Sequence, residues 1–127
     1  MVMGELMWME LAKAADVLAK DLLSVKEGEN VLIYGDTSTD ERVVRATASA
    51  IYVAGGVPVV VLYETRRDID IEPPKPLAAA MRNADVICEF AKMYLIHTKA
   101  YREALAAGAR ALCLSGMDAD MMIRCMG

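Results

Sequence analysis

Four short apolar runs, separated by segments with helical periodicity, are the feature that most constrains the fold of this 127-residue chain. The runs are rich in Val, Ile and Leu, and they span 31–34, 57–63, 86–90 and 111–115. A continuous apolar run of this length is typical of a strand that is buried on both faces of a sheet. Strands that alternate with helices predict a parallel sheet. We therefore expect an α/β fold, a three-layer doubly wound domain with a four-stranded parallel sheet and helices on both faces.

The segments between the runs have the signals of helices. In the first, from about 4 to 23, apolar residues recur at spacings of three and four, and they are Leu11, Ala14, Leu18 and Leu22. Further helices are expected up to 54 and over 77–82, 99–107 and 118–126. Thr39 or Asp40 can cap the second helix, and Thr98 can cap the fourth, because their side-chain oxygens accept backbone N–H groups.

Length, charge and hydropathy exclude several classes of protein. The chain is one domain long, so 1–127 is treated as a single domain. Fourteen basic and eighteen acidic residues give a net charge of −4, and no basic stripe with interleaved aromatic residues occurs, which argues against a nucleic-acid partner. Glu5 and Glu10 make the N-terminus a poor signal peptide, and no apolar run approaches the ~20 residues needed to cross a membrane. We expect a soluble protein of the cytoplasm.

The number and spacing of the cysteines are those expected of a protein in the reducing cytoplasm. There are three, at positions 88, 113 and 125, so they cannot all pair within the chain, and none has the spacing of a zinc site. Cys88 and Cys113 fall in the predicted buried strands, where a cysteine usually behaves as a small apolar side chain. We expect reduced thiols.

His97 is the only histidine, and it lies between the third apolar run and the helix that follows. In open α/β sheets, ligands bind where strands deliver their carboxyl ends. Beside a helix N-terminus the dipole disfavours the imidazolium, and a neutral imidazole can accept a proton as a general base. His97 is therefore the candidate catalytic residue, with Tyr94 and Thr98 as candidate substrate-binding neighbours. The alternative is a structural histidine that caps or packs at the start of a helix.

The loop 35–39, which follows the first run, is the second candidate region. It lacks the glycine pattern of a phosphate-binding turn, and Asp36 would repel a phosphate there. Asp36 and the hydroxyl of Thr37 remain candidates for binding a neutral or cationic substrate, and simple helix capping is the alternative. A strand order of 2-1-3-4 would bring this loop and His97 to one crevice, whereas an order of 3-2-1-4 would separate them. The sequence leaves both orders open.

No metal site is expected within the chain. Asp68, Asp70 and Glu72 alternate with isoleucines, a pattern typical of an exposed edge or loop rather than of a metal site. Neither a zinc-protease motif nor a calcium-binding loop occurs. We therefore expect no metal ligand among these residues.

The final helix is unusually rich in methionine. Met117, Met121, Met122 and Met126 cluster loosely on one side of it, and the chain stops at Gly127 without a polar tail. These side chains either pack onto the domain's own sheet or form a surface for a partner, which would be a following domain or a second copy of the chain.

Several phrases, in order along the chain, resemble the leucyl aminopeptidases of the thermophilic T and S type. They are SVKEGENVLI at 24–33, AGGVPVV at 54–60, ADVI at 84–87, HTKA at 97–100, and GAR through GM at 108–117. The resemblance extends from about Leu11 to Arg124. The ring-cleaving dihydroxypyridine dioxygenases, which share this architecture, are similar as well.

The resemblance implies a two-domain metalloenzyme, a hydrolase in the peptidase case, whose divalent Zn, Co or Fe is held by a C-terminal domain. The chain would be a truncated N-terminal domain that forms one wall of the cleft, with no cofactor of its own and no activity alone. In the dioxygenase branch, an N-terminal histidine is expected to face the metal-bound substrate, and His97 matches that position. A third alternative is a small-ligand-binding module that acts by association only.

Overall fold

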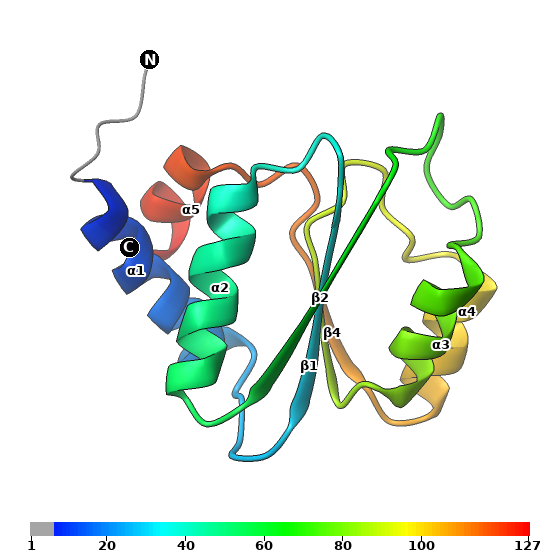
Figure 1. Ribbon diagram of the computed structural model, residues 1–127, viewed down its shortest axis with the longest axis horizontal. Helices are drawn as coiled ribbons and strands as arrows, with labels where there is room; N and C mark the ends of the chain where they lie inside the picture. The colour runs from blue at the N-terminus through cyan, green and yellow to red at the C-terminus, as the bar shows by residue number, and fades with distance from the viewer. Residues whose placement is uncertain (1–6) are drawn as a thin grey trace.

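The computed structural model describes residues 7–127 and confirms the predicted α/β class (Figure 1). The strands are β1 (Asn30–Asp36), β2 (Val57–Tyr63), β3 (Val86–Glu89) and β4 (Arg110–Cys113). The helices are α1 (Trp8–Val17), its π-helical continuation η2 (Leu18–Leu22), α2 (Glu41–Val53), α3 (Lys75–Asn83), α4 (Lys99–Ala106) and α5 (Ala119–Met126). Helices α1, α2 and α5 cover one face of the sheet, and α3 and α4 cover the other (Figure 1).

The four strands are all parallel and lie in the order β2-β1-β3-β4. This is one of the two orders that the sequence left open. The direction of winding changes between β1 and β3, so the loops that follow these two strands meet at the carboxyl edge of the sheet. Because all strands are parallel, both candidate loops lie at one end of the molecule, and the strand order makes them neighbours there.

Alternation along the strands builds two apolar cores. Val31, Ile33 and Cys88 face α1, α2 and α5, whereas Leu32 and Ile87 face α3 and α4. All five side chains are at most 2% exposed. Complete burial of an aliphatic side chain contributes roughly 1.5–3 kcal/mol, so the two aliphatic layers supply most of the drive to fold.

The first helix departs from the predicted pattern at its end. Leu11, Ala14 and Leu18 are buried as expected, but Leu22 is 52% exposed. The backbone over Leu18–Leu22 forms a π-helix, whose wider turn rotates later side chains away from the face set by α1. The expectation that Leu22 faces inward is therefore wrong. The start of the predicted helix, at 4–6, lies outside the described residues.

The prediction that β2 is buried on both faces is also wrong. Because the strand order leaves β2 at an edge, it has a neighbour on one side only, and Val59, Val60 and Leu62 are 44%, 43% and 57% exposed. Strand β4 forms the opposite edge, where Cys113 is only partly buried, whereas Cys88 in β3 is fully buried. The length of an apolar run does not reveal whether a strand is central or at an edge.

The predicted caps are confirmed. The carboxylate of Asp40 accepts the backbone N–H of Arg42 at the start of α2, and Thr98 Oγ1 accepts that of Tyr101 at the start of α4. Among the described residues, none of the helices combines the length and apolar character that a membrane crossing requires.

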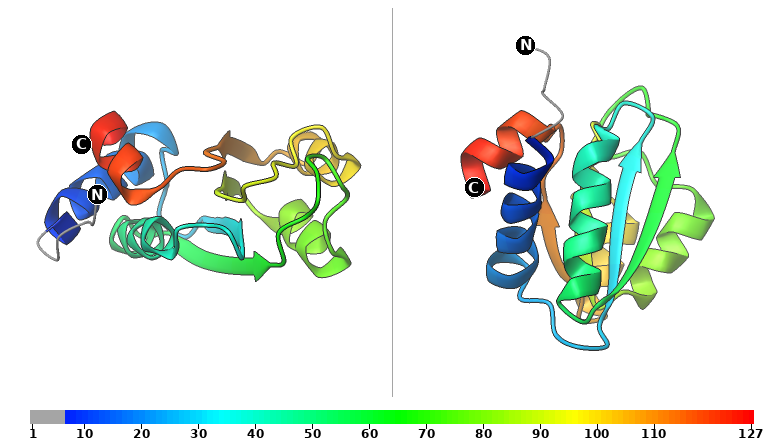
Figure 2. Two further views of the ribbon diagram at one scale, coloured as in Figure 1. Left: turned by 90° about the horizontal axis from the view of Figure 1, so that it is seen from above. Right: turned by 60° about the vertical axis from the view of Figure 1, so that its left-hand side comes forward.

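The methionine-rich helix α5 lies beside α1 (Figure 2). Met122 is fully buried, and Met117 and Met126 are partly buried against the same core. Met121 is 37% exposed. This arrangement favours packing onto the domain itself, with Met121 as the most exposed of these four methionines.

Arg110 ties the start of β4 to the turn before β1. Its guanidinium donates to both carboxylate oxygens of Glu29, each at 2.8 Å, and to the carbonyl oxygens of Leu23 at 3.1 Å and Ser24 at 3.2 Å. The bonds from Arg110 to the carboxylate, together with the backbone N–H of Lys26, lower the pKa of Glu29 to about 2, from an ordinary value of 4.5. The pair therefore stabilises the folded state fully above pH 4.5, and its contribution is lost as the pH falls from 4.5 to about 2.

We expect Arg110→Ala to lower the free energy of unfolding by about 1 kcal/mol at pH 7, because the pair is only partly exposed and bidentate. Urea unfolding measures the change. The difference between variant and wild type should shrink as the pH is lowered toward 2. Arg124→Ala, which removes an exposed i,i+4 pair with Asp120, is the control and should change stability by less than about 0.5 kcal/mol. Equal losses in the two variants would contradict this account.

Candidate functional site

Asp36 joins the loops that follow β1 and β3. It is the last residue of β1 and is only 3% exposed. Its Oδ1 accepts the backbone N–H of Ser38 at 2.9 Å, and its Oδ2 accepts that of Lys92 at 2.8 Å. Both oxygens are therefore used within the protein. Asp36 is therefore buried below the surface of this edge, where it links the two loops by hydrogen bonds. Its side chain is not exposed to a substrate, as the predicted binding role would require.

The hydroxyl groups of the loop after β1 also bond within the protein. Thr39 Oγ1 accepts the backbone N–H of Asp36 at 2.9 Å, and it lies 3.2 Å from the Phe90 carbonyl oxygen, to which it can donate. A Cβ on Gly35 would lie 2.9 Å from the same Oγ1, so this close approach requires glycine. Thr37 Oγ1 lies 3.1 Å from Thr65 Oγ1 and accepts the Thr65 N–H at 3.1 Å. Thr37 thus links the loops after β1 and β2.

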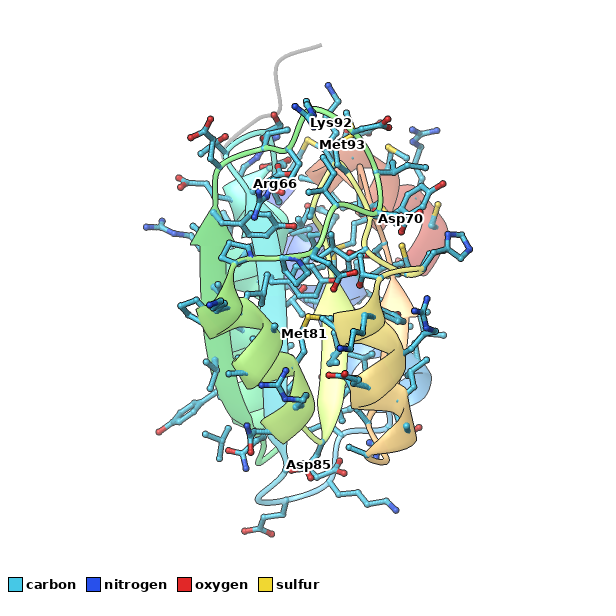
Figure 3. The ribbon with its side chains drawn as sticks, turned by 90° about the vertical axis from the view of Figure 1, so that its right-hand side faces the viewer. Arg66, Asp70, Met81, Asp85, Lys92 and Met93 are labelled. Carbon is cyan, nitrogen blue, oxygen red and sulfur yellow. The ribbon has the colours of Figure 1, made fainter. Side chains whose placement is uncertain are left out.

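His97 is paired with Asp70, a residue of the long loop between β2 and α3. The Asp70 carboxylate accepts the backbone N–H of His97 through Oδ1, and its Oδ2 lies 2.9 Å from His97 Nδ1. The His97 side chain is 70% exposed. Figure 3 shows Asp70 at the carboxyl edge of the sheet, the end that also carries Lys92, while Asp85 marks the opposite edge. Aspartate binding at Nδ1 leaves Nε2 free among the described residues.

The backbone of Asp70 supports this pairing. Its φ of +56° is in the left-handed region, which aspartate tolerates better than most residues, and its N–H donates to the Tyr94 carbonyl oxygen at 2.8 Å. Burial alone would raise the pKa of Asp70, but hydrogen bonds from the backbone and ring of His97 hold that pKa below its ordinary value. An ionised Asp70 favours the tautomer with a proton on Nδ1, so Nε2 can accept a proton from a substrate.

Of the two predicted substrate-binding neighbours of His97, Tyr94 lies beside the imidazole at the surface and Thr98 is buried. The Tyr94 ring meets the imidazole edge-on, with centroids 6.2 Å apart. Thr98 is 1% exposed, and its hydroxyl donates to the Leu95 carbonyl oxygen at 2.7 Å besides capping α4. Tyr94 can therefore contact a ligand held by His97, whereas Thr98 fixes the turn beneath.

Two hollows open at this edge of the sheet. One, of about 340 Å³, lies between the loops after β1, β3 and β4 and includes Ser38, Phe90 and Lys92 in its wall. The other, of about 630 Å³, lies along the loop after β2 and is lined in part by Tyr63 and by Ile71, the residue next to Asp70. His97 lines neither hollow, and its partner Asp70 is the sequence neighbour of Ile71 in the wall of the second. Within 7–127, no three His, Cys, Asp or Glu side chains gather as a metal-binding group.

Sequence reasoning missed two residues of this region. Asp70 was grouped with Asp68 and Glu72 as loop residues, and nothing in the sequence reveals that a carboxylate 27 positions before His97 reaches its ring. Glu89 was taken as part of an apolar strand, but it is a fully buried carboxyl group. The signal for Glu89 was present, because an acidic residue inside a buried run needs a reason.

We expect Asp70→Asn to abolish the fixed tautomer of His97. Asparagine keeps the left-handed backbone, but its amide can donate as well as accept, so Nδ1 no longer faces a pure acceptor. Nitrogen-15 NMR of the ring reads the tautomer directly, since the chain has one histidine. Asp68→Asn is the control, because within residues 7–127 the Asp68 carboxylate accepts only the N–H of its neighbour Ile69. An unchanged ring spectrum in Asp70→Asn would contradict the assigned role.

Comparison with known proteins finds likeness at the level of fold. No protein-family model and no curated protein sequence matches the chain. The solved structure of 2,5-dihydroxypyridine dioxygenase from Pseudomonas putida KT2440 is similar to it with a TM-score of 0.69 and 17% identity, over 85% of this chain and 34% of that one. AmpT from Thermus thermophilus, a peptidase, is similar with a TM-score of 0.58 and 14% identity, over 94% of this chain and 42% of that one. The chain thus spans less than half the length of either neighbour, and its fold is that of one portion of each.

Proposed function

We propose that the chain is the substrate-facing N-terminal domain of a two-domain metal-dependent enzyme, and that His97 acts in it as a proton acceptor oriented by Asp70. The pairing of Asp70 with His97 Nδ1 at 2.9 Å is the observation that carries the proposal. A carboxylate on one ring nitrogen sets the tautomer and leaves the other nitrogen free for general-base work. The pair stands at the carboxyl edge of a parallel sheet, which is where ligands bind in such folds.

The uncovered apolar surface supports a role as one part of a larger assembly. Besides the edge strand β2, the groove between α1 and α2 exposes large apolar side chains, with Trp8 at 64% and Val53 at 76%. Exposed apolar surface of this kind is typical of a face that contacts further protein. In the proposal these surfaces meet a second domain or a second copy, and the exposed Met121 of α5 is a further point of contact.

The metal belongs to the rest of the enzyme in this proposal. The described residues offer no donor set for it, so none of them is assigned as a ligand. A divalent ion, when bound, would polarise the substrate or lower the pKa of a bound water. The contribution of this chain is to close one side of the cleft, to contact the substrate through Tyr94, and to take a proton at His97 Nε2.

Ring cleavage of a dihydroxypyridine is the chemistry that this geometry favours, because such a substrate has a hydroxyl proton for His97 to accept. The likeness to the dioxygenase structure supports this choice at the level of the fold. Removal of an N-terminal residue from a peptide is the second candidate, which the likeness to AmpT along 94% of this chain supports. In that case the domain would cover the metal site and His97 would not be needed for turnover.

The variant His97→Ala, made in the full protein, distinguishes the two candidate activities. Oxygen uptake on 2,5-dihydroxypyridine with added Fe²⁺ should fall at least about a hundredfold if His97 is the base. Hydrolysis of leucine p-nitroanilide with Zn²⁺ or Co²⁺ should survive the change if the protein is a peptidase. Lys99→Ala, which alters an exposed side chain two residues away, is the matched control and should leave either activity unchanged. Oxygen uptake that is insensitive to His97→Ala would contradict the role proposed for His97.

A further inference from the structure

Glu89 is a carboxyl group placed inside the core, directly beneath the loop that carries His97. It is the last residue of β3 and is 0% exposed. In the register of the sheet it lies between Tyr34 of β1 and Cys113 of β4, on the face covered by α3 and α4. Neither an apolar role nor contact with solvent explains a carboxyl group at this position.

The hydrogen bonds of Glu89 converge on one of its two oxygens. The Tyr34 hydroxyl donates to Oε2, and the backbone N–H of Leu95 donates to the same oxygen at 2.8 Å. The other oxygen, Oε1, is buried, and no N–H or O–H group of the described residues donates to it. The further hydrogen-bonding neighbour of the carboxyl group is the thiol of Cys113, which is a weak donor. Among the described residues, no lysine, arginine or histidine forms an ion pair with Glu89. A carboxylate carries its charge on both oxygens, so this one-sided pattern fits a neutral acid whose carbonyl oxygen is Oε2 and whose hydroxyl is Oε1.

We infer that Glu89 is kept as a neutral carboxylic acid and is a positioning residue for His97, because its carbonyl oxygen anchors Leu95. The part that concerns His97 rests on the proposed function; the protonation state and the anchoring of Leu95 do not. This assignment accounts both for the buried carboxyl group and for its hydrogen bond to Leu95, the residue two positions before His97. It adds to the site a residue that touches neither substrate nor metal.

The charges around Glu89 favour the neutral form. The titratable groups that face it are Tyr34 on β1, Tyr63 on β2, Cys88 beside it on β3, Cys113 on β4, Tyr101 on α4 and Asp70 on the loop above. Each is neutral or negative at neutral pH, and none is a cation. Burial raises the pKa of Glu89, and the charge of Asp70 acts in the same direction against the hydrogen bonds that lower it. A charge held there without a counter-ion would be strongly disfavoured.

Leu95 transmits the anchoring to His97. Leu95 is fully buried, and its carbonyl oxygen accepts both the backbone N–H of Thr98 at 3.0 Å and the Thr98 hydroxyl at 2.7 Å. His97 lies inside this short turn, and its own N–H is held by Asp70 at 2.9 Å. Glu89 therefore fixes the turn from below while Asp70 fixes the ring from the side. Loss of the Glu89 bond should therefore loosen the backbone of the turn, whereas loss of the Asp70 bonds should free the imidazole ring.

The protonation state is tested on the chain itself by infrared difference spectroscopy. At pH 7 the wild type should show the carbonyl band of a protonated carboxyl group, and Glu89→Gln should lack it. Detection of this band only under acidic conditions would overturn the inference, because Glu89 would then be ionised at neutral pH. This measurement needs neither metal nor substrate, so its result does not depend on whether the proposed function is correct.

The positioning role is tested by amide exchange at Leu95, with Ile87 in the middle of β3 as an internal reference. Glu89→Gln keeps a carbonyl oxygen for Leu95 and should change its exchange less than about twofold. Glu89→Leu removes that acceptor and should speed exchange at Leu95 at least about tenfold more than at Ile87, with loss of the single His97 tautomer. Equal exchange in the two variants, or strong loosening in Glu89→Gln, would overturn the positioning role.

A milder variant covers the case in which Glu89→Leu does not fold. Tyr34→Phe removes one of the two donors to Oε2 and should loosen Leu95 severalfold, whereas Tyr52→Phe, at a 73% exposed position on α2, should not. Identical behaviour of these two variants would count against the role. If all these results agree with the inference but His97→Ala leaves the enzyme active, the proposed function fails and the anchoring of Leu95 by Glu89 stands.

Discussion

The pairing of β1 with β3 determines the rest of the structure. This pairing puts two strands from separate crossovers side by side in the centre of the sheet, and their loops then emerge together at one edge. Asp36 fastens the loops by accepting N–H groups from both of them. If β1 and β3 were apart, the buried carboxylate would lose its second partner and would be costly to bury. The central pairing and the polar tie beneath the edge therefore depend on each other.

Much of the fold could be predicted from local signals. The four strands, the capping roles of Asp40 and Thr98, and the placement of His97 at the carboxyl edge all follow from apolar runs, side-chain oxygens before helices and the geometry of parallel sheets. Each of these signals lies within a few residues of the feature that it predicts. The exposure of Leu22 could not be predicted in this way, because a π-helical turn leaves no clear mark in the pattern of apolar residues.

The candidate site could be predicted less well from the sequence, because its contacts join residues that are far apart along the chain. The partner of His97 lies 27 positions away in a loop without regular structure, and a contact of this kind arises only when the chain has folded. Thr98 and Asp36 were correctly located at the edge, but the sequence did not reveal that their side chains would be buried and bonded internally. Glu89 was visible as an acid within an apolar run, yet only the fold places Leu95 above it.

The edge strand β2 has a consequence for how this protein behaves at high concentration. In the part of the chain that the structure describes, one side of its backbone has no strand partner, and Val57–Tyr63 contains no charged residue that would oppose pairing with a strand of another molecule. Pro58, near its beginning, is the only residue there that cannot donate to an added strand. An open edge of this kind can pair with a strand of another molecule and so extend the sheet between molecules. Contact with further protein along β2 would therefore protect the chain against aggregation.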